Sequence, residues 1–241
     1  MLHNDLAGIG LYFGFIIAIG LPLVLLKAFV RMPFEVTRKV YHLAITLSIY
    51  PLVKVFSAWY MAVLAVFAFA AVVYPVLALV ERSAAFQKIA VEREGGEFKR
   101  SLLIVQVSIA LLIFVFWGLL GDAYKYIAVV AVMAWGFGDA AAALVGKTFG
   151  RRKIRHPRVQ GAKTYEGTRA MFATAGVAVF LTLVVYAGQA WQVALPVALL
   201  VAPVCAAVEL FSTRGMDTLT VPISAGLAVL SWMLLFAYLG V

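Results

Sequence analysis

Charged residues are scarce in this sequence of 241 residues. Asp, Glu, Lys and Arg together make up 13% of it, whereas they make up about a quarter of typical soluble domains. Hydrophobic residues account for 65%. A chain with so little charge cannot cover a soluble surface, which excludes a soluble enzyme and leaves no room for a separate soluble domain. We expect a single integral membrane domain over residues 1–241.

Cysteine and acidic residues are also rare. Cys205 is the one cysteine in the sequence, which excludes an intrachain disulfide and a cysteine-based zinc site. The 11 acidic residues are outnumbered by 20 Lys and Arg, for a formal net charge of +9. A basic chain can bind nucleic acid, but nearly all these cations lie in short stretches between apolar runs. Such stretches are typical of cytoplasmic loops, so we expect no nucleic-acid partner.

Long apolar runs make up most of the remaining sequence. A membrane helix needs roughly 20 apolar residues, and about eight stretches approach or exceed this length. The second is short, so seven spans result if it fails to cross. The sequence therefore predicts an all-α, polytopic bundle of transmembrane helices. The expected spans are about 6–26, 41–56, 58–80, 101–120, 126–146, 168–187, 191–208 and 221–239.

The basic residues predict the orientation of the bundle. They concentrate in the loops after the first, third, fifth and seventh spans, and only Lys54 and Lys125 remain for the opposite face. The positive-inside rule places the charged loops in the cytoplasm and both termini outside. We expect a prokaryotic plasma membrane. An odd number of spans would move one terminus to the other side.

One stretch, residues 136–172, combines a carboxylate inside an apolar run with a glycine-rich basic loop and the start of the next helix. The carboxylate is Asp139. An ionisable side chain at the centre of a bilayer costs about 2.5–3.5 kcal/mol or more, so such a residue is a functional candidate by default. The alternative is a carboxylate that reaches the nearby interface or pairs with a lysine.

Small residues recur at every fourth position around this carboxylate, at Gly138, Ala142, Gly146 and Gly150. This spacing gives a helix a smooth stripe on which another helix can pack closely. Packing is expected of the stripe whatever the function, and the stripe would also permit a homodimer.

The loop after this span is rich in cations. Lys147 and Arg152 belong to it, and backbone amides near Gly146 and Gly150 can face an anion. The sequence therefore predicts a phosphate-binding loop, with contact to anionic lipid headgroups as the ordinary alternative. The other cations of the run are Arg151, Lys153, Arg155 and Arg158.

The start of the next helix carries a further polar cluster. A helix N-terminus presents unpaired amides and a partial positive charge, which suits phosphate. Lys163 could reach phosphate oxygens, and Glu166 could bind magnesium, which favours one or two carboxylates together with phosphate oxygens. Thr164, Gly167 and Thr168 could cap the helix or donate hydrogen bonds. A plain helix cap is the alternative.

Two smaller clusters are expected on the same face of the membrane. Arg38, Lys39 and His42 lie at the start of the second span, where the histidine could bind phosphate or move a proton. Glu209 and Asp217 lie in the last loop and are candidates for substrate or metal binding. As an isolated pair, these two carboxylates would more often be ordinary loop charges.

Taken together, these residues resemble the core of the CTP-dependent lipid-alcohol kinases, which include dolichol kinase, phytol and farnesol kinases and yeast-type diacylglycerol kinase. The chain departs from the family pattern at Thr218, where relatives often have asparagine, and at Thr168, where they have serine. Three matching pieces follow the family's order along most of the chain. They are Arg38-Lys39-Val40-Tyr41-His42, then Gly138-Asp139 with Gly146, Gly150, Lys163-Thr164 and Glu166-Gly167-Thr168, then Val208-Glu209-Leu210 with Gly215-Met216-Asp217 and Val221-Pro222.

The resemblance implies transfer of the γ-phosphate of CTP to a lipid hydroxyl, with magnesium, at the cytoplasmic face of the bilayer. It implies that Asp139 binds metal or activates the alcohol, with Glu166 and Asp217 as further metal candidates and Glu209 as a substrate candidate. Lys163 and His42 would take part in catalysis. The implied nucleotide-binding residues are Arg38, Lys39, Lys147, Gly150, Arg152, Lys163, Thr164, Gly167 and Thr168.

Three other functions remain open from the residues. Phosphatidate cytidylyltransferases share the Gly-Asp and Lys-Thr-x-Glu-Gly motifs, but their C-terminal signature contains a histidine, and this chain has none after His156. The Gly136–Asp139 segment reads GxGD, as in intramembrane aspartyl proteases, but no second acid lies within a span as that chemistry requires. A transporter or non-catalytic lipid-binding scaffold is the third possibility.

Overall fold

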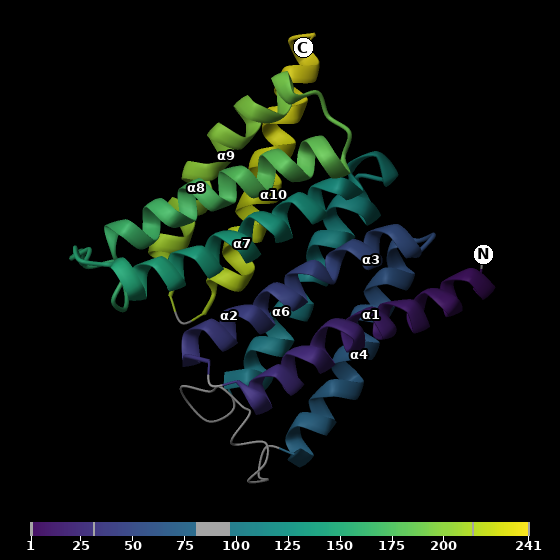
Figure 1. The fold of residues 1–241 in the computed structure, drawn as a ribbon. Coiled ribbons are helices and arrows are strands. Elements are labelled where there is room, and N and C mark those ends of the chain that lie inside the picture. Colours follow the sequence, from purple (N-terminus) through teal and green to yellow (C-terminus); the bar gives the residue numbers. More distant parts are fainter. Residues whose placement is uncertain (1, 31, 81–96, 214, 241) are drawn as a thin grey trace. The chain divides into compact units, whose positions relative to one another are not determined.

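The computed structural model describes residues 2–30, 32–80, 97–213 and 215–240 of the chain. Within these ranges every regular element is helical, apart from one isolated antiparallel pairing between Lys153 and Thr164 (Figure 1). The helices form two compact units, Met1–Leu119 and Leu120–Val241. The predicted all-α fold is confirmed, while the expectation of a single domain stays a prediction.

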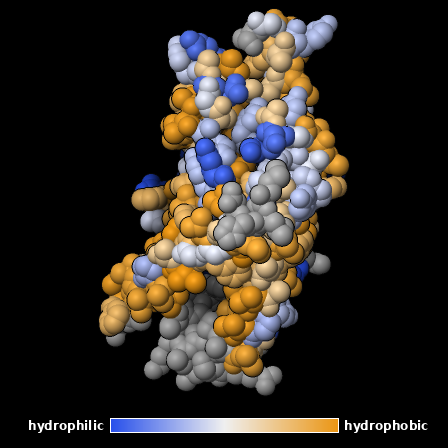
Figure 2. Space-filling view, turned by 90° about the vertical axis from the view of Figure 1, so that its right-hand side faces the viewer, coloured by the Kyte–Doolittle hydropathy of each residue, from blue (hydrophilic) through white to orange (hydrophobic). Residues whose placement is uncertain are grey.

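Seven helices in the described part of the chain are long and apolar enough to cross a bilayer. Large apolar side chains on them face outward, and Figure 2 shows hydrophobic residues over much of one face. Outward apolar surface on this scale suits lipid better than water. The seven helical segments are Asp5–Lys27, Trp59–Leu79, Lys99–Leu119, Asp122–Phe149, Tyr165–Tyr186, Trp191–Phe211 and Asp217–Tyr238.

The second expected span is not a single helix. It consists of α2 (Phe34–Leu47) and α3 (Ile49–Val55), which have 14 and 7 residues. The break falls at Ser48, whose hydroxyl donates to the Ile45 carbonyl at 2.7 Å. Neither piece alone is long enough to cross a bilayer. If only unbroken helices are considered, the described residues therefore contain seven candidate spans, as the alternative predicted.

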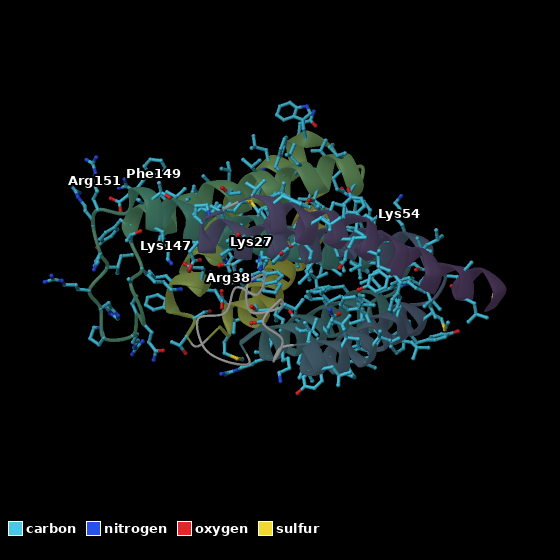
Figure 3. The ribbon with its side chains drawn as sticks, turned by 60° about the horizontal axis from the view of Figure 1, so that its bottom comes forward. Lys27, Arg38, Lys54, Lys147, Phe149 and Arg151 are labelled. Atoms are coloured by element: carbon cyan, nitrogen blue, oxygen red, sulfur yellow. The ribbon has the colours of Figure 1, made fainter. Side chains whose placement is uncertain are left out.

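The two pieces nevertheless run back along α1 (Leu2–Phe29) to its beginning. Ser57, just after α3, donates its N–H and its hydroxyl to the Asp5 carboxylate at 2.8 and 2.7 Å. Figure 3 shows Arg38 and Lys54 toward opposite ends of this unit. The path of the chain is therefore compatible with a broken second pass, and the side of the membrane that holds the N-terminus stays a prediction.

The rest of the first unit is a pair of packed helices. Helix α4 (Trp59–Val80) packs against α6 (Glu97–Ile113), and α6 continues as the π-helical segment η1 (Phe114–Leu119). Most of the loop expected between these helices, residues 81–96, lies outside the described residues.

The second unit is a four-helix bundle. After the short 3-10 helix η2 (Asp122–Tyr124), its helices are α7 (Lys125–Phe149), α8 (Tyr165–Leu181), α9 (Trp191–Phe211) and α10 (Asp217–Tyr238), with the π-helical segment η3 (Thr182–Tyr186) extending α8. Helix α7 packs on α8 and α10, and α9 packs on the same two helices. Both α7 and α9 therefore end where α8 and α10 begin.

The stripe of small residues on α7 packs against α8 within the chain. A β-carbon added at Gly138 would lie 2.5 Å from the Met171 sulfur, and one added at Gly146 would lie 3.2 Å from the Thr164 hydroxyl oxygen. Glycine lets the two backbones approach, as the spacing predicts. Because α8 occupies the stripe, the stripe no longer argues for a homodimer.

Gly167 on α8 also lies against α7, and its replacement tests how closely the two helices pack. A β-carbon there would lie 2.9 Å from the Ala142 carbonyl oxygen, which is backbone and cannot turn away. We expect Gly167→Ala to destabilise the protein by about 1–3 kcal/mol through overpacking, measured by thermal unfolding in detergent. The matched control is Gly14→Ala on α1, where no neighbouring atom lies within 4 Å of the added carbon. Equal melting temperatures for both variants would contradict the close contact.

Candidate active site

The basic loop between α7 and α8 is a paired hairpin. The Ile154 N–H donates to the Lys163 carbonyl at 2.9 Å, and the Tyr165 N–H donates to the Arg152 carbonyl at 3.1 Å. The hairpin therefore has a defined position above the start of α8, which the sequence did not predict. Figure 3 shows Phe149 and Arg151 projecting outward where α7 gives way to it.

Two side-chain contacts hold this hairpin to the helices. The Glu166 carboxylate accepts a hydrogen bond from the Arg152 N–H at 3.3 Å. The His156 ring packs edge-on against Phe211 at the end of α9, with the ring centroids 5.8 Å apart. Glu166, a predicted metal ligand, thus lies against the base of the hairpin and remains partly exposed.

Thr164 caps α8, so its hydroxyl has a structural role. The hydroxyl oxygen accepts from the Gly167 N–H at 3.1 Å, and the Thr164 carbonyl accepts from the Thr168 N–H at 3.0 Å. Gly167 and Thr168 were expected to bind the nucleotide, and their amides lie at the helix N-terminus that suits phosphate. Because both amides already have partners inside the chain, a phosphate could accept from either only by sharing or replacing one of these hydrogen bonds.

Glycines at the end of α7 are needed for packing around this cap. A β-carbon at Gly150 would lie 2.7 Å from the Thr164 side-chain methyl group. Gly150 therefore has a packing reason to be glycine, independent of any role in binding nucleotide. The cation of the same turn, Lys147, is exposed.

Lys163 and Glu209 form the best-defined ion pair of the site. The Lys163 ammonium lies 2.7 Å from Glu209 Oε1 and also donates to the Glu209 main-chain carbonyl. The side chains are 21% and 10% exposed. Glu209 was expected in a loop, but it lies in the last turn of α9, where the lysine both neutralises its charge and caps the helix end.

Asp139 lies deeper in the bundle than this cluster. It is buried, with 9% relative exposure. Its neighbour Gly138 packs on Met171, whereas Gly146 packs on Thr164. At 1.5 Å per helical residue, Asp139 is therefore about 10 Å further along the helix pair than the Thr164 cap. Asp139 and the cluster around Thr164 and Lys163 therefore lie at different depths of the same four-helix bundle.

Asp217 begins α10 and is half-buried. The connection from α9 is held by a hydrogen bond between the hydroxyls of Ser212 and Thr220 at 2.7 Å. Because α10 begins at the end of the bundle where α9 finishes, Asp217 belongs to the same end as Glu209.

The predicted cluster on the second span belongs to the first unit. Arg38 forms a 2.9 Å ion pair with Glu35 one helical turn earlier, and Lys39 is buried. His42 follows on the same helix and is half-buried. The expected meeting of these residues with the cluster around Lys163 stays a prediction.

Comparison with known proteins places the chain in a family. It is 32% identical over 244 aligned positions to a phytol kinase from the cyanobacterium Synechocystis sp., and the match covers 96% of this chain and 93% of that protein. The chain belongs to the lipid-alcohol kinase family. This kinase is therefore a phosphotransferase that acts on an alcohol, as predicted. No family model and no solved structure matches the chain.

The candidate carboxylates of the site, Asp139, Glu166, Glu209 and Asp217, all lie in the second unit. In the described ranges, no three His, Cys, Asp or Glu side chains are grouped so that they could hold a metal ion by themselves. Magnesium commonly takes only one or two protein carboxylates and completes its shell with phosphate oxygens and water. A magnesium ion at Asp139, Glu166 or Asp217 would therefore need water or phosphate oxygens to complete its shell.

Proposed function

We propose that this kinase transfers the γ-phosphate of CTP to the hydroxyl of a long-chain prenyl alcohol such as phytol. The observation that carries the proposal is the 32% identity to a phytol kinase over 96% of the chain. The choice of CTP rests on the resemblance of the motifs described above. In the reaction, the alcohol oxygen attacks the γ-phosphorus and the bond to the β–γ bridging oxygen breaks. CDP leaves with that electron pair, and the hydroxyl proton passes to a base.

Such a transfer depends on positioning and charge neutralisation more than on covalent chemistry by the protein. We assign Lys163 and Lys147 to the phosphates, because both lie at the end of the bundle where α7 finishes and α8 begins. We assign Asp139, which is deeper and surrounded by apolar helices, to the alcohol. The lipid tail can then stay among the helices while the nucleotide binds from water.

Carboxylates suit magnesium, and the carboxylate donors present fit the ion when a nucleotide supplies the remaining ligands. Glu166 and Asp217 are the candidates to hold it, and Asp139 is a candidate only if it binds metal instead of activating the alcohol. When bound, magnesium would neutralise phosphate oxygens as charge develops on them. Arg38, Lys39 and His42 of the first unit remain candidates for nucleotide binding, and we propose that the site faces the cytoplasm.

An assay of the purified protein in detergent tests the proposal. Each of CTP, ATP, GTP and UTP is offered with phytol, farnesol, a polyprenol and diacylglycerol, with and without a magnesium chelator, and all products are resolved. We expect CDP and phytyl phosphate, with CTP preferred by at least about tenfold in kcat/KM. A CDP-lipid with pyrophosphate would instead identify a cytidylyltransferase. An unchanged lipid in every reaction would contradict a kinase of this specificity.

A further inference from the structure

We infer that Glu209 is a positioning residue, which holds the ammonium of Lys163 in place for the nucleotide phosphates and does not contact the lipid. The inference rests on the proposed function and assigns Glu209 a role different from the substrate contact expected from the sequence. It is argued from the 2.7 Å ion pair between Glu209, in the last turn of α9, and Lys163, just before α8.

The contacts of Lys163 leave it able to bind a ligand. A lysine ammonium has three N–H donors. Within the described residues, its hydrogen bonds use two of them, one to Glu209 Oε1 and one to the Glu209 carbonyl. The Lys163 side chain is 21% exposed to solvent. One donor and an accessible face thus remain for a phosphate oxygen.

Lysine has a flexible four-carbon stem, and fixing it at the moment of binding reduces affinity. Glu209 fixes it beforehand from a rigid element, the last turn of a 21-residue helix. The Lys163 main chain is fixed as well, since its carbonyl accepts from the Ile154 N–H at 2.9 Å. Both ends of the side chain are therefore held before any nucleotide arrives.

If Lys163 only capped the end of α9, its contact with the Glu209 main-chain carbonyl would be enough, and the Glu209 carboxylate would not be needed. Any cation that meets the Glu209 carbonyl would satisfy the end of α9. The carboxylate adds a second, charge-assisted contact to the same ammonium, and such contacts are shorter and more directional than neutral ones. It also lowers the positive charge of the site. If Glu209 only neutralised the site, its removal would strengthen CTP binding, whereas a positioning role predicts weaker binding.

The test compares wild type with Glu209→Gln, which keeps the size and loses the charge, and Glu209→Asp, which keeps the charge on a shorter stem. Three quantities are measured in detergent: the Kd of CTP–magnesium, the KM of each substrate, and the melting temperature. We expect Glu209→Gln to weaken CTP binding roughly 10- to 100-fold, with the KM of the lipid within about twofold. Glu209→Asp should recover part of the loss, and a Lys163→Met/Glu209→Gln double variant should bind CTP no worse than Lys163→Met.

Unchanged or tighter CTP binding by Glu209→Gln would overturn the inference, and so would a change confined to the lipid KM. If Glu209→Gln is too unstable to measure, the same criteria apply to Glu209→Asp. CTP binding does not depend on turnover. Wild type that binds CTP but phosphorylates no alcohol would therefore count against the proposed function, while the Glu209 comparison would still decide the positioning role.

Discussion

Replacement of Asp139 by asparagine is expected to lower kcat by about 10²–10⁴-fold, the range associated with loss of a general base. The substitution keeps the size of the side chain and removes its charge. Asp139 lies within a 28-residue apolar helical segment, where an unneeded carboxylate would be costly. We expect the variant to remain folded, because asparagine keeps the size and the polar character of the side chain, so the loss of activity would not come from unfolding. Kinetics and thermal unfolding of the purified protein in detergent measure the two effects.

The matched control for this substitution is Asp122→Asn. Asp122 lies on η2 at the opposite end of α7, and its side chain is 73% exposed in a 3.5 Å pair with Lys125. Exposed pairs of this kind contribute about 0–1 kcal/mol, so neither activity nor stability should change. Full activity in Asp139→Asn would show that this carboxylate is a structural group and that the alcohol is activated elsewhere.

Hydropathy predicted the apolar segments that can cross the membrane. The helices themselves extend beyond these segments where polar side chains form ion pairs. Helix α9 was expected to end near residue 208, yet it continues to Phe211 because Lys163 pairs with Glu209 in the last turn. Helix α2 begins at Phe34, before the expected 41, and carries the Glu35–Arg38 ion pair in its first turns. Apolar length predicts the part of a helix within the bilayer, whereas the helix ends also depend on polar partners, which can be local, as for Glu35 and Arg38, or distant in sequence, as for Lys163 and Glu209.

Candidate site residues can be named from the sequence, but the contacts between them cannot. Lys163 and Glu209 were both candidates, yet they are 46 positions apart, and no local rule pairs residues at that separation. The Asp5 contact with Ser57 was missed for the same reason, since the two are 52 positions apart. Conversely, the four-residue spacing of small residues on α7 predicted its close packing, because helix periodicity is a local property.

Loss of the Lys163 ammonium is the second large effect that we expect. Lys163→Met should lower kcat/KM for CTP by about 10²–10³-fold, the scale seen when one preorganised donor is removed. The single variant should also lose stability, by about 1–3 kcal/mol, because the nearly buried Glu209 carboxylate keeps no lysine partner. Adding Glu209→Gln removes that stranded charge. The double variant should therefore regain stability while its activity stays low.

This separation distinguishes a catalytic lysine from a structural one. If Lys163 only joined α8 to α9, activity would return together with stability in the double variant, and that outcome would contradict its assignment to the phosphates. Lys125→Met is the matched control, since Lys125 pairs with the exposed Asp122 at 3.5 Å and is 36% exposed itself. Its kcat/KM for CTP should stay at the wild-type value. The comparison thus tests whether one cation, fixed by the end of a neighbouring helix, supplies the charge that phosphoryl transfer needs.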